Sequence, residues 1–105
     1  MLVVYLLKRD YMGQIFHDLD SLKEHLCDMG YEETIVFDNP SYVTAAVGVT
    51  DDGRVVYDYD LMVDYLVDTD NMEPDEAMEF IDYNTIRAIP YFGDNAPIVI
   101  HMFEG

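Results

Sequence analysis

The sequence has no tryptophan and one cysteine, Cys27, and only five of its 105 residues are Lys or Arg. A single cysteine excludes an internal disulfide and suits the reducing cytosol. The few basic residues stand against 22 Asp and Glu, which gives a formal net charge of -17. Direct binding to nucleic acid or to an anionic membrane is therefore opposed, because both carry negative charge.

Residue patterns typical of catalysis or metal binding are also missing. The six glycines are scattered, so the sequence contains no phosphate-binding loop. His25 and Cys27 are two residues apart on an expected helix, so they point to different faces and do not form a zinc site. An acidic run from Asp68 has Glu73 where a calcium loop needs glycine. We expect no enzymatic activity, no metal and no cofactor.

Long apolar runs are absent too. The opening MLVVYLL is too short to cross a membrane. It also lacks the basic residues and the small-residue cleavage site of a signal peptide. We expect residues Leu2 to Leu7 to form a buried strand, and we expect a cytoplasmic protein.

The chain nevertheless has the composition of a folded domain. Half of its residues are hydrophobic and 13% are aromatic, which is too much for a disordered chain. The length predicts one acidic domain over residues 1–105. Its charge exceeds the magnitude of about 2 to 8 that keeps a small designed domain soluble.

The spacing of apolar residues predicts the order strand, helix, strand, hairpin, two helices, strand. The first helix is expected over 18–29, and a short strand over 32–37 precedes a turn at 38–40. Asp51-Asp52-Gly53 lies between two β-rich runs within 42–59 and predicts a hairpin. Helices follow over 60–69 and from about 73 to 87, then a loop marked by Pro90, Gly93 and Pro97, and a final strand over 97–103. We expect an α+β fold with a mixed or mostly antiparallel sheet of about four to five strands packed with about three helices.

The two later helices carry the most unusual feature of the sequence. Residues 55–85 contain ten acidic residues and no Lys, Arg or His. At about 100° per residue, the acids of each helix form a narrow stripe opposite a wide apolar surface. The acids that we expect to bind a partner are Asp60, Asp64, Asp68, Asp75, Glu76, Glu79 and Asp82, with Tyr59, Tyr65 and Tyr83 as aromatic contacts.

Two interpretations of these stripes stay open. In the first, each stripe is only the solvated face of an acidic protein. Like-charged residues at i and i+4 then destabilise the helix by roughly 0.2–0.5 kcal/mol per pair. Alternatively, the carboxylates imitate a phosphate backbone and compete with nucleic acid for a basic channel. Arg87 is expected to neutralise Asp82 or Asp94 at the end of the last helix.

Two segments carry a resemblance to a known family. GVTDDGRVVYDYDLMVDYL, followed by PDEAMEFIDYNTIRAIPYFGDNAPIVI, resembles small acidic uncharacterised proteins of Gram-positive gut bacteria and their phages. The blocks at residues 82–91 and 96–100 are the most similar, and the resemblance spans roughly residues 46 to 100. The family includes anti-CRISPR inhibitors of type II Cas9, but it has no catalytic motif to carry over.

The resemblance implies an inhibitor that acts in a bacterial host cell. Cas9 holds its heteroduplex in a positively charged channel, which an acidic surface could occupy. The resulting hypothesis is an anti-CRISPR-like inhibitor that binds a basic nucleic-acid-handling protein by imitating DNA. The alternative is a small bacterial adaptor whose acidic surface only solubilises it and whose binding patch lies around Tyr91 and Phe92.

Overall fold

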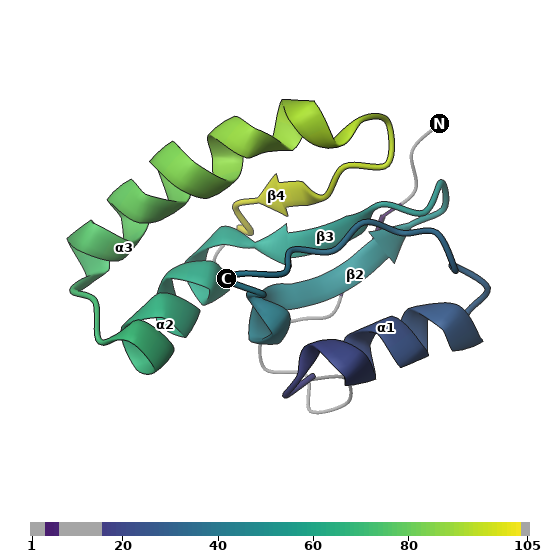
Figure 1. The fold of residues 1–105 in the computed structure, drawn as a ribbon, viewed down its shortest axis with the longest axis horizontal. Coiled ribbons are helices and arrows are strands. Elements are labelled where there is room, and N and C mark those ends of the chain that lie inside the picture. The colour runs from purple at the N-terminus through teal and green to yellow at the C-terminus, as the bar shows by residue number, and fades with distance from the viewer. Residues whose placement is uncertain (1–3, 7–15, 104–105) are drawn as a thin grey trace.

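The chain folds as α+β, as the sequence predicts. The structure is a computed structural model that describes residues 4–6 and 16–103. Its α-helices are α1 (Leu19–Asp28), α2 (Tyr59–Asp70) and α3 (Pro74–Phe80). Its strands are β1 (Val4–Leu6), β2 (Ala46–Thr50), β3 (Val55–Asp58) and β4 (Ile98–Ile100). In the view of Figure 1, α1 and α3 lie beyond opposite edges of the sheet, and both contribute side chains to one core.

The sheet is mixed, with the strands in the order β1-β2-β3-β4. β2 pairs antiparallel with both β1 and β3, whereas β3 and β4 run parallel. Parallel neighbours require a crossover, and here the whole helical segment after β3 provides it. The expected count of strands is not confirmed. β2, β3 and β4 lie within the continuously described residues 16–103 and form a mixed sheet of three strands. β1 has only three residues, and the segments before and after it lie outside the described residues.

The hairpin forms where the Asp-Gly signal predicts it. Gly53 has φ +87°, a left-handed conformation that glycine adopts without steric cost. Its N–H donates to the Thr50 carbonyl at 3.0 Å, and the Thr50 N–H donates to the Arg54 carbonyl at 2.8 Å. These bonds close the turn and set the register in which Val49 faces Val55.

Local capping explains where the helices begin and end. Asp18 accepts a hydrogen bond of 2.8 Å from the Ser21 N–H and so caps α1. Asp58 does the same for α2 by accepting from the Asp60 N–H at 3.0 Å. Asn71, with φ 57°, ends α2 in the left-handed region. Pro74 is the first residue of α3, a position where the missing N–H of proline costs no helical hydrogen bond.

Three predicted elements differ in the structure. The final strand, expected over 97–103, is confined to β4 (Ile98–Ile100). Residues 32–37 form no strand, and at the end of this segment the Phe37 N–H donates to the Tyr57 hydroxyl at 3.1 Å. The last helix does not stop at Arg87. It continues from α3 into the π-helix η2 (Ile81–Thr85) and the 3-10 helix η3 (Ile86–Phe92), so Pro90 is helical and the loop begins only at Gly93.

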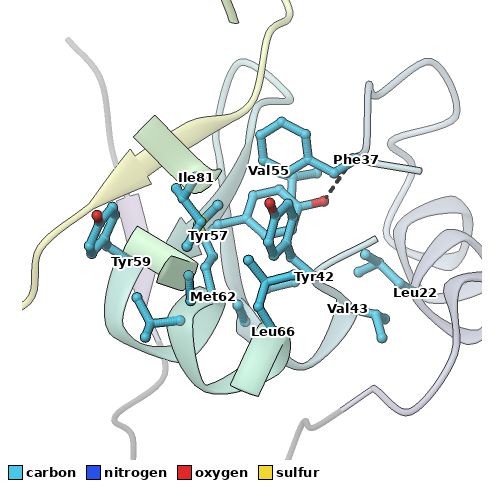
Figure 2. Close-up of a cluster of buried hydrophobic side chains, with 14 of the residues drawn as sticks. Leu22, Phe37, Tyr42, Val43, Val55, Tyr57, Tyr59, Met62, Leu66 and Ile81 are labelled. Atoms are coloured by element: carbon cyan, nitrogen blue, oxygen red, sulfur yellow. Dashed lines mark hydrogen bonds between the residues drawn. The ribbon is translucent and has the colours of Figure 1, made fainter. Parts of the chain in front are cut away.

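The core lies between the sheet and α2, and it extends to α1 and α3. Figure 2 shows Met62 and Leu66 of α2 meeting Tyr57 of β3, Ile81 of η2 and Tyr42 there. All five are fully buried. Leu22 and Leu26 of α1 are also buried and belong to this core. α2 is therefore fixed by its apolar side, and its remaining side is left to acidic residues.

Candidate functional site

The outer side of α3 presents carboxylates because its inner side is packed. Ala77 and Ile81, four residues apart, are both fully buried. Asp75, Glu76 and Glu79 fall on the other faces of the helix and are exposed. The helical period thus turns a local run of acids into an exposed face.

These carboxylates share one shallow hollow of 620 Å³ along α3. Three of the seven predicted acids line it together, namely Asp75, Glu76 and Glu79. Glu73, which precedes the helix, adds a fourth carboxylate, and its N–H donates to the Glu76 carboxylate at 3.3 Å. The remaining lining residues are Phe80, Tyr83 and Asn84. We call this hollow the α3 acidic hollow.

Two further predicted acids meet at Tyr59. The Tyr59 hydroxyl donates to Oδ1 of Asp82 at 3.1 Å. Burial, the bond to Asp82 and the nearby charges of Asp82 and Asp60 raise the pKa of Tyr59 to about 12. Asp60 and Asp82 are far apart in the sequence, yet they act on the same hydroxyl. The structure therefore brings the first turn of α2 next to η2.

The other acids of α2 lie elsewhere. Asp68 lines a second hollow of 480 Å³ between the start of α1, the segment before β2, and α2. Asp18 and Asp38 line this hollow too. Asp64 is exposed, and like Asp60 it interacts with other groups of the chain. Six of the seven predicted acids therefore fall into the α3 acidic hollow, the Tyr59 contact and the hollow near α1, and Asp64 lies in none of these groups.

Of the three predicted contact aromatics, only Tyr83 is open to a partner. It is 64% exposed. Tyr59 is 9% exposed, and its ring packs against His101 at 4.5 Å between ring centres. Tyr65 is half-buried, with its hydroxyl 3.2 Å from Oγ of Ser41. The helical pattern did not reveal this burial, because the covering groups come from distant parts of the chain.

Arg87 makes a different contact from the one expected. Its guanidinium carbon lies 5.6 Å from the centre of the Tyr83 ring, within the range of a cation–π interaction. The spacing of four residues along a helix accounts for this contact. Arg87 therefore stacks on an aromatic of the α3 acidic hollow, in place of the predicted pairing with Asp82 or Asp94.

Some site residues were missed in the sequence. Glu73, Phe80 and Asn84 also line the α3 acidic hollow. Phe80 and Asn84 follow Glu76 at intervals of four, so helical periodicity could have identified them. Asp18 and Asp38 join Asp68 only through tertiary packing, and no local signal connects them.

Within residues 4–6 and 16–103, no group of three or more His, Cys, Asp or Glu could hold a metal ion. No helix in this part of the chain is long and apolar enough to span a membrane.

The fold and the site define a small acidic α+β domain with a carboxylate-lined helical face. Comparison of the chain with family models, with curated proteins and with solved structures gave no match. Its function must therefore be argued from the site itself.

Proposed function

We propose that this chain is an anti-CRISPR-like inhibitor that binds a basic nucleic-acid-handling protein, with type II Cas9 as the partner. The observation that carries the proposal is the α3 acidic hollow, in which four carboxylates line one open surface. The resemblance of residues 46–100 supplies the identity of the partner. No catalytic step is part of the proposal.

The physical basis is competition for a cationic groove. A groove that binds nucleic acid gains affinity because its lysines and arginines neutralise phosphates and so release the counterions condensed on the polymer. Carboxylates one helical turn apart, with Cβ atoms roughly 5–6 Å apart, present negative charge at a spacing of the same order as a phosphate backbone. The net charge of -17 also speeds encounter with such a groove at low salt.

The structure supports an acidic surface that is centred on α3. Asp75, Glu76 and Glu79 are exposed and share the α3 acidic hollow. Asp82 is exposed one turn further on, and its carboxylate is oriented by Tyr59. Asp60 extends this surface towards α2, whereas Asp68 lies in the other hollow and is less central.

The test is inhibition of DNA cleavage by a purified Cas9–guide complex. The variant Asp75→Asn/Glu76→Gln/Glu79→Gln removes three charges from the α3 acidic hollow. Its matched control, Asp20→Asn/Glu24→Gln/Asp28→Asn, removes three exposed charges from α1. We expect the first variant to lose inhibition and the second to retain it. Equal inhibition by both variants, or no inhibition by the unmodified chain, would overturn the proposal.

A second measurement concerns the step that is blocked. A pull-down with Cas9 before and after loading of guide and target DNA separates competition from other modes of inhibition. A DNA mimic binds the form that lacks target DNA and is released steeply by salt. Binding that is equal in both forms contradicts mimicry.

A second candidate function is a bacterial adaptor that binds through an apolar patch. Tyr91 is 90% exposed and Phe92 is 40% exposed, so the end of η3 presents aromatic surface. The Phe92 ring packs against Phe37 with 6.3 Å between ring centres, which holds the patch in place. Binding through this patch would be insensitive to salt and would be lost in Tyr91→Ala.

A further inference from the structure

The α3 acidic hollow contains an aromatic ring as well as carboxylates. Tyr83 lines it beside Glu79 and Asn84. The residue is 64% exposed even though the Arg87 guanidinium carbon lies 5.6 Å from the centre of its ring. Tyr83 therefore already contacts one guanidinium group and still has ring surface open to another.

The combination of carboxylates and an exposed aromatic ring distinguishes an arginine side chain from a lysine side chain. An ammonium group of lysine is compact and strongly hydrated, and it gains mainly from charge. A guanidinium is planar and weakly hydrated, pairs with carboxylates through two parallel hydrogen bonds, and stacks on aromatic rings. Carboxylates next to an exposed ring thus favour arginine.

We propose that the α3 acidic hollow binds arginine side chains of a basic protein segment in preference to lysine side chains. Carboxylates such as those of Glu76 and Glu79 pair with the guanidinium, and the Tyr83 ring stacks on it. The binding mode rests on the proposed function, since both require a basic partner, and it adds the residue type that the partner presents. Charge complementarity selects this occupant over a second copy of the chain, because each copy carries -17.

The acidic residues alone would give a smaller preference, through paired hydrogen bonds with the guanidinium and without stacking on a ring. The hollow near α1 contains Asp18, Asp38 and Asp68, and its aromatic, Tyr65, has its hydroxyl 3.2 Å from Ser41 and its ring 5.7 Å from that of Tyr42. Tyr83, in contrast, is mostly open to solvent. The presence of an accessible ring is what separates the α3 acidic hollow from the other.

The experiment measures binding of two fluorescent peptides of equal length, oligo-arginine and oligo-lysine, to the full chain at an ionic strength of about 0.15 M. A cation–π contact at an exposed site corresponds to roughly a two- to fivefold change in affinity. We therefore expect the chain to bind oligo-arginine at least about twofold more tightly than oligo-lysine. Tyr83→Leu should reduce this preference by about the cation–π contribution, mainly by weakening the binding of oligo-arginine.

Two further variants control for indirect effects. Tyr91→Leu removes another exposed tyrosine that does not line the hollow, and it should leave the preference intact. Tyr83→Phe keeps the ring and should also retain it, which guards against a folding defect in Tyr83→Leu. Equal affinity of the unmodified chain for both peptides overturns the inference, as does a preference of unchanged size in Tyr83→Leu.

The result is separable from the Cas9 test. An arginine preference that depends on Tyr83, without inhibition of Cas9, supports the binding mode and rejects the proposed partner. Inhibition of Cas9 by a chain that has no arginine preference supports the partner and rejects the binding mode.

Discussion

The hydroxyl of Tyr59, in the first residue of α2, donates a 3.1 Å hydrogen bond to the carboxylate of Asp82 in η2. The bond joins the start of one acidic helix to the π-helical turn that follows the other. A π-turn in the middle of a helix is often found at a functional site. Here the bond orients an exposed acid next to the α3 acidic hollow and links it to the sheet through α2.

Tyr59→Phe should cost about 0.5–1.5 kcal/mol in the free energy of unfolding, because it removes one hydrogen bond and keeps the buried ring. Asp82 is exposed, so water can replace the lost donor and the cost should lie near the lower end of this range. Urea unfolding measures the change. Tyr91→Phe, at a side chain that is 90% exposed, should have no measurable effect. A loss from Tyr59→Phe as small as from Tyr91→Phe would show that the bond does not stabilise the fold.

Stability should fall between about pH 10 and pH 12. Burial raises the pKa of Tyr57 from the ordinary 10 to about 12, although the hydrogen bond from the Phe37 N–H opposes this shift. A raised tyrosine pKa means that folding favours the neutral phenol. This contribution is fully present below pH 10 and is lost as the pH rises through the folded pKa. Urea unfolding at a series of pH values, with tyrosinate absorbance in parallel, measures both.

Tyr57→Phe provides the internal control for this alkaline loss. The variant should be less stable at neutral pH by roughly 1–3 kcal/mol, because the buried Phe37 N–H loses its acceptor. Above pH 10 its stability should fall less steeply than that of the unmodified chain. Parallel pH profiles for the two proteins would contradict the assignment of the loss to Tyr57.

Leu66→Ala should destabilise the fold by about 2–5 kcal/mol, since Leu66 of α2 is fully buried and truncation leaves a cavity. The comparison is Met78→Ala on α3, where the side chain is 40% exposed and the expected change is within about 0.5 kcal/mol. Urea midpoints measure both. Similar losses in both variants would indicate that α2 does not form the core described in Figure 2.

Glu79→Lys should stabilise the protein although it removes a candidate binding residue. The lysine would pair with Asp75 one turn earlier, so a like-charge pair that costs roughly 0.2–0.5 kcal/mol becomes an attractive pair of similar size. Added salt should raise the urea midpoint of the unmodified chain more than that of the variant, because salt screens repulsion. Glu79→Gln should lie between the two. A less stable Glu79→Lys would mean that Glu79 makes a favourable contact in the folded chain.

The elements that the sequence predicted correctly are those with local signals. The hairpin depends on Gly53, α1 on Asp18 and its apolar spacing, and α3 on Pro74, and each acts within a few residues of its own position. The expectation for residues 32–37 was wrong: the segment forms no strand, and the hydrogen-bond partner of the Phe37 N–H is the hydroxyl of Tyr57, twenty residues away. Local pattern cannot show such a pairing.

The candidate site was predictable to a similar extent. Helical spacing grouped Asp75, Glu76 and Glu79, which the structure places in one hollow. It could not show that Tyr59 is buried or that Asp68 belongs with Asp18 and Asp38, since these contacts depend on how α2 packs against other elements. The continuation past Arg87 was missed because Pro90 usually ends an α-helix but is accommodated here in a 3-10 helix.

The parallel pairing of β3 and β4 has a consequence for how the acidic surface meets a partner. The helical segment leaves from one of these strands and returns to its immediate neighbour, so both of its ends are fixed in the same sheet (Figure 1). A surface held at both ends has little conformational freedom to lose when it is bound. Its association rate should then be limited by diffusion and ionic attraction, without a slow step of ordering.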